Sequence, residues 1–233
     1  MNQGLSSKQI YLGNAKLKKA GVQIDYTEEQ LKEIVKCSND IDYFCRTYMK
    51  IVNIDEGIVP LDLYDFQLDI MKSVIQNRFS ICKMPRQSGK TTTMVAVILW
   101  FVLFNESFNC AILANKASTA REILGRLQMA YEWLPHWLQQ GIVEWNKGSL
   151  ELENGSKILA SSTSSSAIRG GSFSLVYLDE FAFVPPELQE EFFASVYPTI
   201  SSGATSRVMI TSTPKGMNLF YKLWIDAEEG RNE

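Results

Sequence analysis

The residues best suited to chemistry lie in one short stretch, residues 84–92, which reads Met-Pro-Arg-Gln-Ser-Gly-Lys-Thr-Thr. An apolar run over 79–84 precedes it and a long helical run over 91–104 follows it, so we expect a strand, a turn and a helix. In a phosphate-binding loop of this kind, backbone N–H groups surround the nucleotide phosphates, the lysine adds a positive charge and the next hydroxyl residue binds Mg²⁺. The positive end of the helix dipole points at the same phosphates. The stretch therefore predicts a nucleotide site built around Lys90 and Thr91.

Met84 is a departure from the usual pattern of such a loop. The pattern G-x-x-x-x-G-K-[ST] begins with a glycine, and Met84 occupies the position of that glycine. The loop also contains an arginine, Arg86. Taken alone, the missing glycine makes the loop look like a slightly defective phosphate-binding turn.

A second pattern lies downstream, where four apolar residues over 175–178 are followed by Asp179 and Glu180. A fully buried parallel strand delivers acidic residues at its carboxyl end, where ligands of α/β sheets bind. This pattern often arises by chance and indicates little by itself. Together with the phosphate-binding loop upstream, it predicts a Walker B strand.

Further candidates lie outside these two patterns. Gln67 lies in the first turn of a helical segment that starts at Tyr64, upstream of the loop, and its amide can bind an adenine because it both donates and accepts. Arg169 lies in the Ser/Thr/Gly-rich residues 161–174, which are either a flexible linker or a nucleotide-facing loop with Arg169 as a charge sensor; we favour the second. Ser212 and Thr213 follow a β-branched strand, which suits a sensor of the hydrolytic water or the γ-phosphate; a capped loop entry is the alternative.

Composition limits the other classes of function. With 233 residues, of which 45% are apolar and 21% charged, the chain fits one domain plus an appendage. The net charge of −3 gives no reason to expect tight nucleic-acid binding, so any DNA contact must be local or made by partners.

The cysteines and the histidine give no sign of a disulfide or a metal site. The four cysteines lack C-x-x-C spacing and are expected to be free thiols in a reducing cytoplasm. The single histidine, His136, has no second histidine for a metal site. The most apolar window, 94–104, is too short to cross a bilayer.

The elements that must position these residues follow from local patterns. Thr27 and Gln30 form a capping-box start for a short helix, whereas residues 1–24 lack a sustained period and suggest a partly ordered leader. Residues 41–52 form one amphipathic segment and 57–63 a loop. The remaining expected elements are helices from 64 and over 118–133, 187–196 and 219–227, strands over 109–115, 157–160 and 207–211, and a hairpin of 142–145 with 149–152.

These elements predict an α/β fold of the P-loop NTPase class, RecA-like or ASCE-like, with a mostly parallel central sheet and helices on both faces. The second acid, Glu180, predicts one strand between the loop strand and the Walker B strand. The full strand order cannot be read from the sequence. We expect residues 1–60 to form a small N-terminal helical segment that is part of a lid subdomain, and residues 61–233 to form the P-loop ATPase core.

Several motifs together carry a family resemblance over about residues 41–230. They are the phosphate-binding loop, Tyr-Asp-Phe-Gln at 64–67, Gly-Ile-Val-Glu-Trp-Asn-Lys-Gly-Ser at 141–149, Ile-Arg-Gly at 168–170, Val-Tyr-Leu-Asp-Glu-Phe-Ala-Phe at 176–183 and Thr-Ser-Thr-Pro-Lys-Gly at 211–216. With them the sequence resembles the large terminase subunit of tailed bacteriophages, especially the T-even-type DNA-packaging motor. Terminases also lack the first glycine and place an arginine inside the loop. Met84 and Arg86 therefore favour the resemblance.

The resemblance implies an ATP- and Mg²⁺-dependent motor that translocates viral double-stranded DNA into an empty procapsid. By position, Lys90 would bind the β/γ-phosphates, Thr91 and Asp179 would hold Mg²⁺, and Glu180 would polarise the attacking water. Arg86 would be an arginine finger acting in cis; a structural or ground-state phosphate ligand is the alternative, and Arg169 is the other finger candidate. The implied nucleotide-binding residues are Phe66, Gln67, Pro85, Arg86, Gln87, Ser88, Gly89, Lys90, Thr91 and Thr92, and the implied coupling residues are Ser212 and Thr213.

The same resemblance implies partners and a location. The partners are the portal protein of the procapsid, the small terminase subunit and double-stranded DNA, with a ring oligomer on the portal and no membrane. The location is the host cytoplasm at the portal during packaging, and not the mature virion. The family's subunit continues into an RNase H-like nuclease, for which we see no acidic cluster, so we expect a fragment with ATPase activity and without DNA cleavage.

Two other readings stay open at the level of sequence. A helicase-like or other P-loop translocase shares the upstream Gln and the Asp-Glu pair, although a helicase needs a second RecA-like lobe. A non-enzymatic nucleotide-binding switch is the other, and the presence of Glu180 argues against it.

Overall fold

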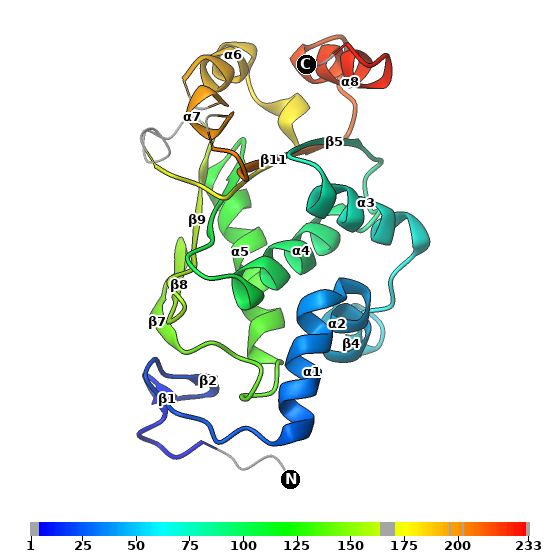
Figure 1. The fold of residues 1–233 in the computed structure, drawn as a ribbon. Helices are drawn as coiled ribbons and strands as arrows, with labels where there is room; N and C mark the ends of the chain where they lie inside the picture. Colours follow the sequence, from blue (N-terminus) through cyan, green and yellow to red (C-terminus); the bar gives the residue numbers. More distant parts are fainter. Residues whose placement is uncertain (1–4, 164–170, 196, 202, 232–233) are drawn as a thin grey trace.

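The computed structural model describes residues 5–163, 171–195, 197–201 and 203–231. In this part of the chain a seven-stranded sheet forms the centre of the molecule (Figure 1). The order of its strands is β5 (Phe79–Lys83), β11 (Arg207–Ser212), β10 (Leu175–Asp179), β6 (Asn109–Ala114), β9 (Lys157–Ser162), β8 (Ser149–Leu152) and β7 (Ile142–Trp145). The strands from β5 to β9 pair in parallel, and β8 and β7 are antiparallel. One strand, β11, lies between β5 and β10, as predicted from Glu180.

Side chains alternate between two hydrophobic clusters along the buried strands. On β10, Leu175 and Tyr177 belong to one cluster, whereas Val176 and Leu178 belong to the other, because successive strand residues point to opposite faces. The first cluster packs against α1 (Glu28–Asn39), α2 (Ile41–Tyr48), α3 (Asp65–Gln76), α4 (Lys90–Phe104) and α5 (Ala117–Glu132); the second packs against α6 (Pro186–Ser195), α7 (Tyr197–Ser201) and α8 (Leu219–Glu228). Figure 1 shows α6, α7 and α8 above the sheet and α3, α4 and α5 below it. The predicted α/β fold with helices on both faces is confirmed.

Helix α4 is apolar on all sides because it is covered on all sides. It lies under the sheet and packs against α2, α3 and α5, and Trp100 Nε1 donates to the carbonyl of Cys37 in α1 at 2.8 Å. A helix that is buried all round needs no polar face. None of the described helices is long and apolar enough to cross a membrane.

The segment after α2 differs from the sequence prediction. Helix α2 ends at Tyr48, and β3 (Lys50–Asn53) pairs antiparallel with β4 (Gly57–Pro60). The expectations of one amphipathic segment over 41–52 and of a loop over 57–63 were therefore wrong. Two adjacent β-branched residues favour a strand over a continued helix, and the left-handed Gly57, with φ of 77°, lets the chain enter β4 after the turn.

The first residues also form more structure than predicted. Strands β1 (Ile10–Tyr11) and β2 (Asn14–Lys18) make a hairpin, and the turn between them has positive φ at Leu12 and Gly13, as tight hairpin turns require. Leu17 is buried, and Ala20 N–H donates to the carbonyl of Ile142 at 3.2 Å. A partly ordered leader was the wrong expectation for these residues. The segment is too short for a hydrophobic period, so its sequence gave little sign of this hairpin.

The other predicted elements are confirmed within a few residues. The capping box of α1 joins Thr27 and Gln30 in both directions, and the hairpin of β7 with β8 has the expected position. Residues 1–60 thus hold α1 and α2 together with two hairpins. That residues 1–60 form a separate segment, as part of a lid subdomain, stays a prediction.

Candidate nucleotide-binding site

The loop of residues 84–89 leaves the carboxyl end of β5 and leads into α4. Met84 N–H donates to the carbonyl of Ser212 at 3.1 Å, so this residue extends the pairing of β5 with β11. Its side chain is buried, and its φ is not positive. The left-handed positions of the loop are Gln87, with φ of 61°, and Gly89, with φ of 75°. The first glycine of the usual pattern is therefore not needed for this loop shape.

Gly89 is required at the end of the loop for two reasons. Its left-handed φ disfavours residues with a side chain, and a Cβ at this position would lie 2.4 Å from Nε2 of Gln67. Gln67 is buried; its Oε1 accepts the N–H of Tyr64 at 3.1 Å and its Nε2 donates to Oγ1 of Thr93 at 3.1 Å. Thr93 in turn donates to the carbonyl of Gly89 at 3.1 Å. Gln67 therefore ties α3 to the loop, a contact that the sequence did not predict.

A groove of about 830 Å³ is lined by the loop, by α3 and the residues just before it, and by Ile51 of β3. The loop contributes Ser88 and Gly89 to its wall, and α3 contributes Gln67. On the same wall the rings of Tyr64 and Phe66 stack with centroids 5.7 Å apart and planes 9° apart. Tyr64 is 69% exposed and Phe66 is 44% exposed, so a flat aromatic surface is open to a ligand. Tyr64 was missed as a site residue, although it begins the Tyr-Asp-Phe-Gln motif.

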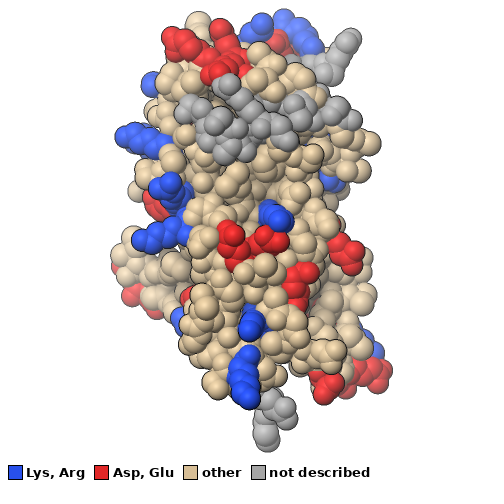
Figure 2. Space-filling view, turned by 90° about the vertical axis from the view of Figure 1, so that its left-hand side faces the viewer, with Lys and Arg blue, Asp and Glu red and all other residues tan. Residues whose placement is uncertain are grey.

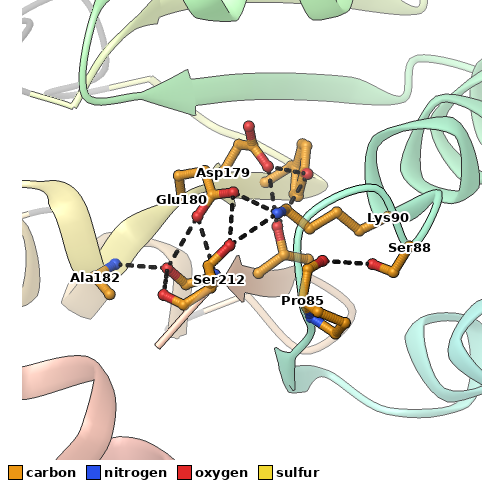
Figure 3. Close-up of polar contacts among 10 residues, drawn as sticks. Pro85, Ser88, Lys90, Asp179, Glu180, Ala182 and Ser212 are labelled. Carbon is orange, nitrogen blue, oxygen red and sulfur yellow. Dashed lines mark hydrogen bonds and ion pairs between the residues drawn. The ribbon is translucent and has the colours of Figure 1, made fainter. Parts of the chain in front are cut away.

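Lys90 and Glu180 meet at the carboxyl edge of the sheet (Figure 3), where Thr213 contacts both of them. Lys90 Nζ forms an ion pair with Oε1 of Glu180 and donates to Oγ1 of Thr213 at 3.3 Å. Thr213 donates its N–H to Oε2 of Glu180 at 2.9 Å and its hydroxyl to Oε1 at 3.1 Å. Ser212, buried behind them, accepts the N–H of Ala182 at 3.0 Å through its Oγ. The structure thus brings four of the predicted site residues into one network.

Glu180 is held in its ionised form and in a strained backbone conformation. Burial opposes ionisation, but the hydrogen bonds from Lys90 and Thr213 outweigh it and lower the pKa of Glu180. The φ of 49° places Glu180 in the left-handed region, which residues with side chains seldom adopt and which costs roughly 1–3 kcal/mol. Such strain gathers at functional sites because only a strong local network maintains it.

Asp179 lies next to this network and is almost fully buried, at 5% exposed. Its Oδ1 accepts the hydroxyl of Tyr177 at 2.7 Å and that of Thr211 at 3.1 Å. Burial raises the pKa of Asp179, and the two hydrogen bonds oppose that shift. Tyr177 and Thr211 were missed from the sequence, where Tyr177 counted only as one of four apolar strand residues. The available signal was a hydroxyl two positions before the acid, on the same face of the strand.

Residues 81–233 match the family model described as terminase large subunit, T4likevirus-type, N-terminal. The chain belongs to this terminase family. The crystal structure of the HK97 bacteriophage large terminase superimposes with a TM-score of 0.70 at 18% identity, over 84% of this chain and 42% of that one. The large terminase ATPase domain of Thermus phage P74-26 gives 0.60 at 24% identity, over 70% of each chain. The UvsW helicase of bacteriophage T4 gives 0.54 at 8% identity, over 80% of this chain and 64% of that one.

At these identities the solved structures show a shared fold, and the family match carries the assignment. The terminase chain described here spans 42% of the length of the HK97 large terminase. The family match begins inside β5 and includes the loop and everything that follows. It leaves the N-terminal hairpin, α1, α2 and α3 outside its bounds.

Arg86 of this terminase chain lies at the rim of the site. Its side chain is exposed, and its guanidinium is 6.0 Å from the ring centroid of Phe183, which follows Glu180 in the chain. Lys215 approaches the same ring at 4.9 Å. The loop thus places Arg86 beside the segment that carries the two acids. Arg169, the other arginine of the sequence prediction, lies outside the described residues.

Proposed function

We propose that this terminase domain hydrolyses ATP to drive viral double-stranded DNA into a procapsid. The observation that supports the proposal best is the network in which Lys90, the first residue of α4, and Glu180, directly after β10, share Thr213, directly after β11. Phosphoryl transfer needs mainly positioning and charge neutralisation. Lys90, at the N-terminus of α4, supplies positive charge, and the carboxylate of Glu180 supplies positioning.

The groove and the loop fit a nucleoside triphosphate. We assign the phosphates to the backbone N–H groups of residues 86–92 at the start of α4, with Lys90 as the counter-charge. The stacked rings of Tyr64 and Phe66 offer a face for the base. Gln67 keeps one amide hydrogen and one acceptor lone pair outside its contacts with Thr93 and Tyr64, which suits the predicted contact with adenine.

Mg²⁺ fits the oxygen donors that flank the loop. Mg²⁺ binds through one or two carboxylates and substrate phosphates and keeps several waters; Asp179 offers such a carboxylate, and Thr91 offers a hydroxyl oxygen, the usual Mg²⁺ ligand of a phosphate-binding loop. We therefore assign them as its ligands, consistent with an Asp179 carboxylate whose Oδ2 accepts no hydrogen bond from the described residues. The ion would neutralise charge on the β- and γ-phosphates.

Nucleotide binding would change the partner of Lys90. Lys90 pairs with Glu180 in the structure, and bound phosphates would compete for the same ammonium group. When Lys90 turns to the phosphates, Glu180 keeps the two donors of Thr213 and Oγ of Ser212 at 3.4 Å. We infer that these donors hold Glu180 in place to polarise the attacking water, and that Ser212 and Thr213 link hydrolysis to movement of β11.

The motor's partners follow from the same proposal. They are the portal, the small terminase subunit and double-stranded DNA, with a ring of subunits at the portal in the host cytoplasm and none in the mature virion. On the face shown in Figure 2, acidic and basic side chains of the described residues are interspersed and separated by uncharged surface. With a net charge of −3, DNA contacts would be local, as expected from the composition.

The Glu180→Gln variant tests the proposal. It should bind Mg·ATP and lose about 10²- to 10⁴-fold in hydrolysis rate, the usual effect of a general base, measured by phosphate release under single-turnover conditions. Lys90→Ala should lose binding itself, measured with a fluorescent ATP analogue. Glu151→Gln, on β8 away from the site, is the control and should match the wild type. Normal hydrolysis by Glu180→Gln would remove Glu180 from the reaction.

A further inference from the structure

One carboxylate oxygen of Asp179, the residue assigned above to Mg²⁺, forms a triangle with two hydroxyl oxygens. The Tyr177 hydroxyl lies 2.7 Å from Oδ1 of Asp179, Oγ1 of Thr211 lies 3.1 Å from the same oxygen, and the two hydroxyls are 3.0 Å apart. All three side chains are buried, at 0%, 1% and 5% exposed for Tyr177, Thr211 and Asp179. The triangle is therefore shielded from solvent.

The sheet itself builds this triangle. Tyr177 and Asp179 are two residues apart on β10, so their side chains leave the same face. The parallel register pairs Tyr177 with Met209 and Leu178 with Ile210. The next step along β11 places Thr211 beside Asp179. Each member is thus fixed by the register of the two strands and not by a loop.

The Tyr177 hydroxyl is costly at this position unless it has a partner. Its ring lies in the hydrophobic cluster that α4 and α5 cover. If packing were the only requirement at this position, a phenylalanine would serve as well. A buried hydroxyl without a hydrogen bond destabilises the fold, and a hydrogen bond to a carboxylate is about twice as strong as a neutral one. The hydroxyl is therefore best explained by its bond to Asp179.

Two donors on one oxygen define the orientation of a carboxylate. Both hydrogen bonds that the described residues make to Asp179 end on Oδ1, and Oδ2 accepts none from them. Resting on the proposed function, we propose that Tyr177 and Thr211 are positioning residues that hold Oδ1 so that Oδ2 faces the Mg²⁺ of the bound nucleotide. Partners of this kind orient metal ligands, and their loss typically weakens metal affinity about 10- to 100-fold.

The test measures metal dependence apart from catalysis. Binding of a fluorescent ADP analogue is titrated with Mg²⁺ for the wild type, Tyr177→Phe and Thr211→Val, and repeated in EDTA. Each variant should need about 10-fold more Mg²⁺ for half-maximal enhancement of binding, with unchanged affinity in EDTA. Thr211→Ser keeps the hydroxyl and should restore the wild-type value.

Two matched controls separate positioning from general loss of a buried hydroxyl. Tyr131→Phe removes an equally buried tyrosine hydroxyl, which donates to the carbonyl of Gln140. Thr163→Val removes a buried threonine hydroxyl that donates to the carbonyl of Ala114 at 3.1 Å. Both should lower thermal stability and leave the Mg²⁺ titration unchanged.

The outcomes discriminate this inference from the proposed function. If the wild type depends on Mg²⁺ and Tyr177→Phe and Thr211→Val titrate like the two controls, the positioning role is wrong and the proposed function stands. If nucleotide binding by the wild type does not respond to Mg²⁺, the metal assignment fails and this inference fails with it. An equal loss of affinity in EDTA would also overturn it, because the defect would then lie in the nucleotide contacts.

Discussion

At the scale of single residues, the main feature of the site is the pairing of Lys90 with Glu180. The pair buries most of two charges, since the side chain of Lys90 is 9% exposed and that of Glu180 is 28% exposed. A buried charge without a partner is strongly unfavourable. Each residue therefore neutralises the charge of the other. The sequence predicted both residues and a separate role for each. It could not predict the ion pair between them, because the predicted roles assign Lys90 to the phosphates and Glu180 to the attacking water.

Arg86 gives a residue-scale prediction. If it acts as an arginine finger, Arg86→Ala should lower the hydrolysis rate by about 10³-fold or more with a modest loss of ATP affinity, because the guanidinium stabilises charge in the transition state. Single-turnover rates and equilibrium binding measure the two effects separately. Lys215→Ala is the control, because Lys215 approaches the same Phe183 ring from outside the loop. A loss of affinity alone would make Arg86 a ground-state phosphate ligand.

At the scale of elements, the loop depends on α3 as much as on β5 and α4. Gln67 of α3 bonds to Thr93 of α4, and Thr93 bonds to the carbonyl of Gly89. This chain of hydrogen bonds links the groove wall to the turn that would hold the phosphates. Two predictions follow, one for the hydroxyl in the chain and one for the glycine at its end.

Thr93→Val should loosen the loop without opening a cavity, because valine keeps the shape of threonine and lacks the hydroxyl. We expect faster amide hydrogen exchange over residues 84–90 and a loss of nucleotide affinity of about 10- to 100-fold, because the substitution removes two hydrogen bonds, one from Gln67 and one to Gly89. Hydrogen exchange by mass spectrometry and fluorescence titration are the measurements. Thr163→Val is the control, since its hydroxyl also donates to a backbone carbonyl. Unchanged exchange in the loop would contradict the bracing role of Gln67 and Thr93.

Gly89→Ala should abolish nucleotide binding. The substitution combines left-handed strain, about 1 kcal/mol or more, with a Cβ placed 2.4 Å from Nε2 of Gln67. Gly13→Ala isolates the first cost, because Gly13 has φ of 83° and no atom within 4 Å of an added Cβ. Both variants should lower the melting temperature, and only Gly89→Ala should lose binding in a titration. Equal binding by both variants would show that the close approach is harmless.

The elements also show where sequence prediction ends. The strand β5, the loop and α4 were predictable because each has a local pattern, and the same holds for β10. The hairpin of β3 and β4 was not, because the apolar residues after α2 continue the pattern of the helix, and the preference of two adjacent β-branched residues for a strand is too weak to decide against a helix. The place of β11 beside β5 is set by pairing between residues far apart in the chain. Of the full strand order, only one strand between β5 and β10 was predicted.

At the scale of the whole molecule, the N-terminal residues are joined to the rest of the chain by packing and by polar contacts, among them a polar cluster. Cys37, Phe44 and Leu17 share a hydrophobic cluster with α4 and α5. The polar cluster centres on Glu153, which accepts the N–H of Gly21 at 2.9 Å and that of Gly141 at 2.5 Å. This contact was not predictable from the sequence, because its members are far apart along the chain.

Glu153 supplies the last prediction, a stability that depends on pH. Its Oε1 pairs at 3.2 Å with Nζ of Lys18, whose side chain is 3% exposed. Burial works against ionisation, but the N–H groups of Gly21 and Gly141 and the charge of Lys18 outweigh it, so the pKa of Glu153 falls below 4.5. Folding thus favours the ionised form. The stabilisation is complete above pH 4.5 and is lost as the pH falls through the lower pKa of the folded state.

Glu153→Gln should therefore cost roughly 2 kcal/mol of unfolding free energy at pH 7, and the difference from wild type should narrow as the pH falls below 4.5. Urea unfolding at a series of pH values measures both. Glu151→Gln removes a carboxylate that pairs with Lys157 at 3.1 Å in a more exposed setting, and should cost less than about 1 kcal/mol. Because Glu153 joins three separate segments, its variant should also speed amide exchange over β1 and β2. A pH-independent loss, or exchange confined to the region of Gly141, would show that Glu153 does not hold the N-terminal hairpin to the sheet.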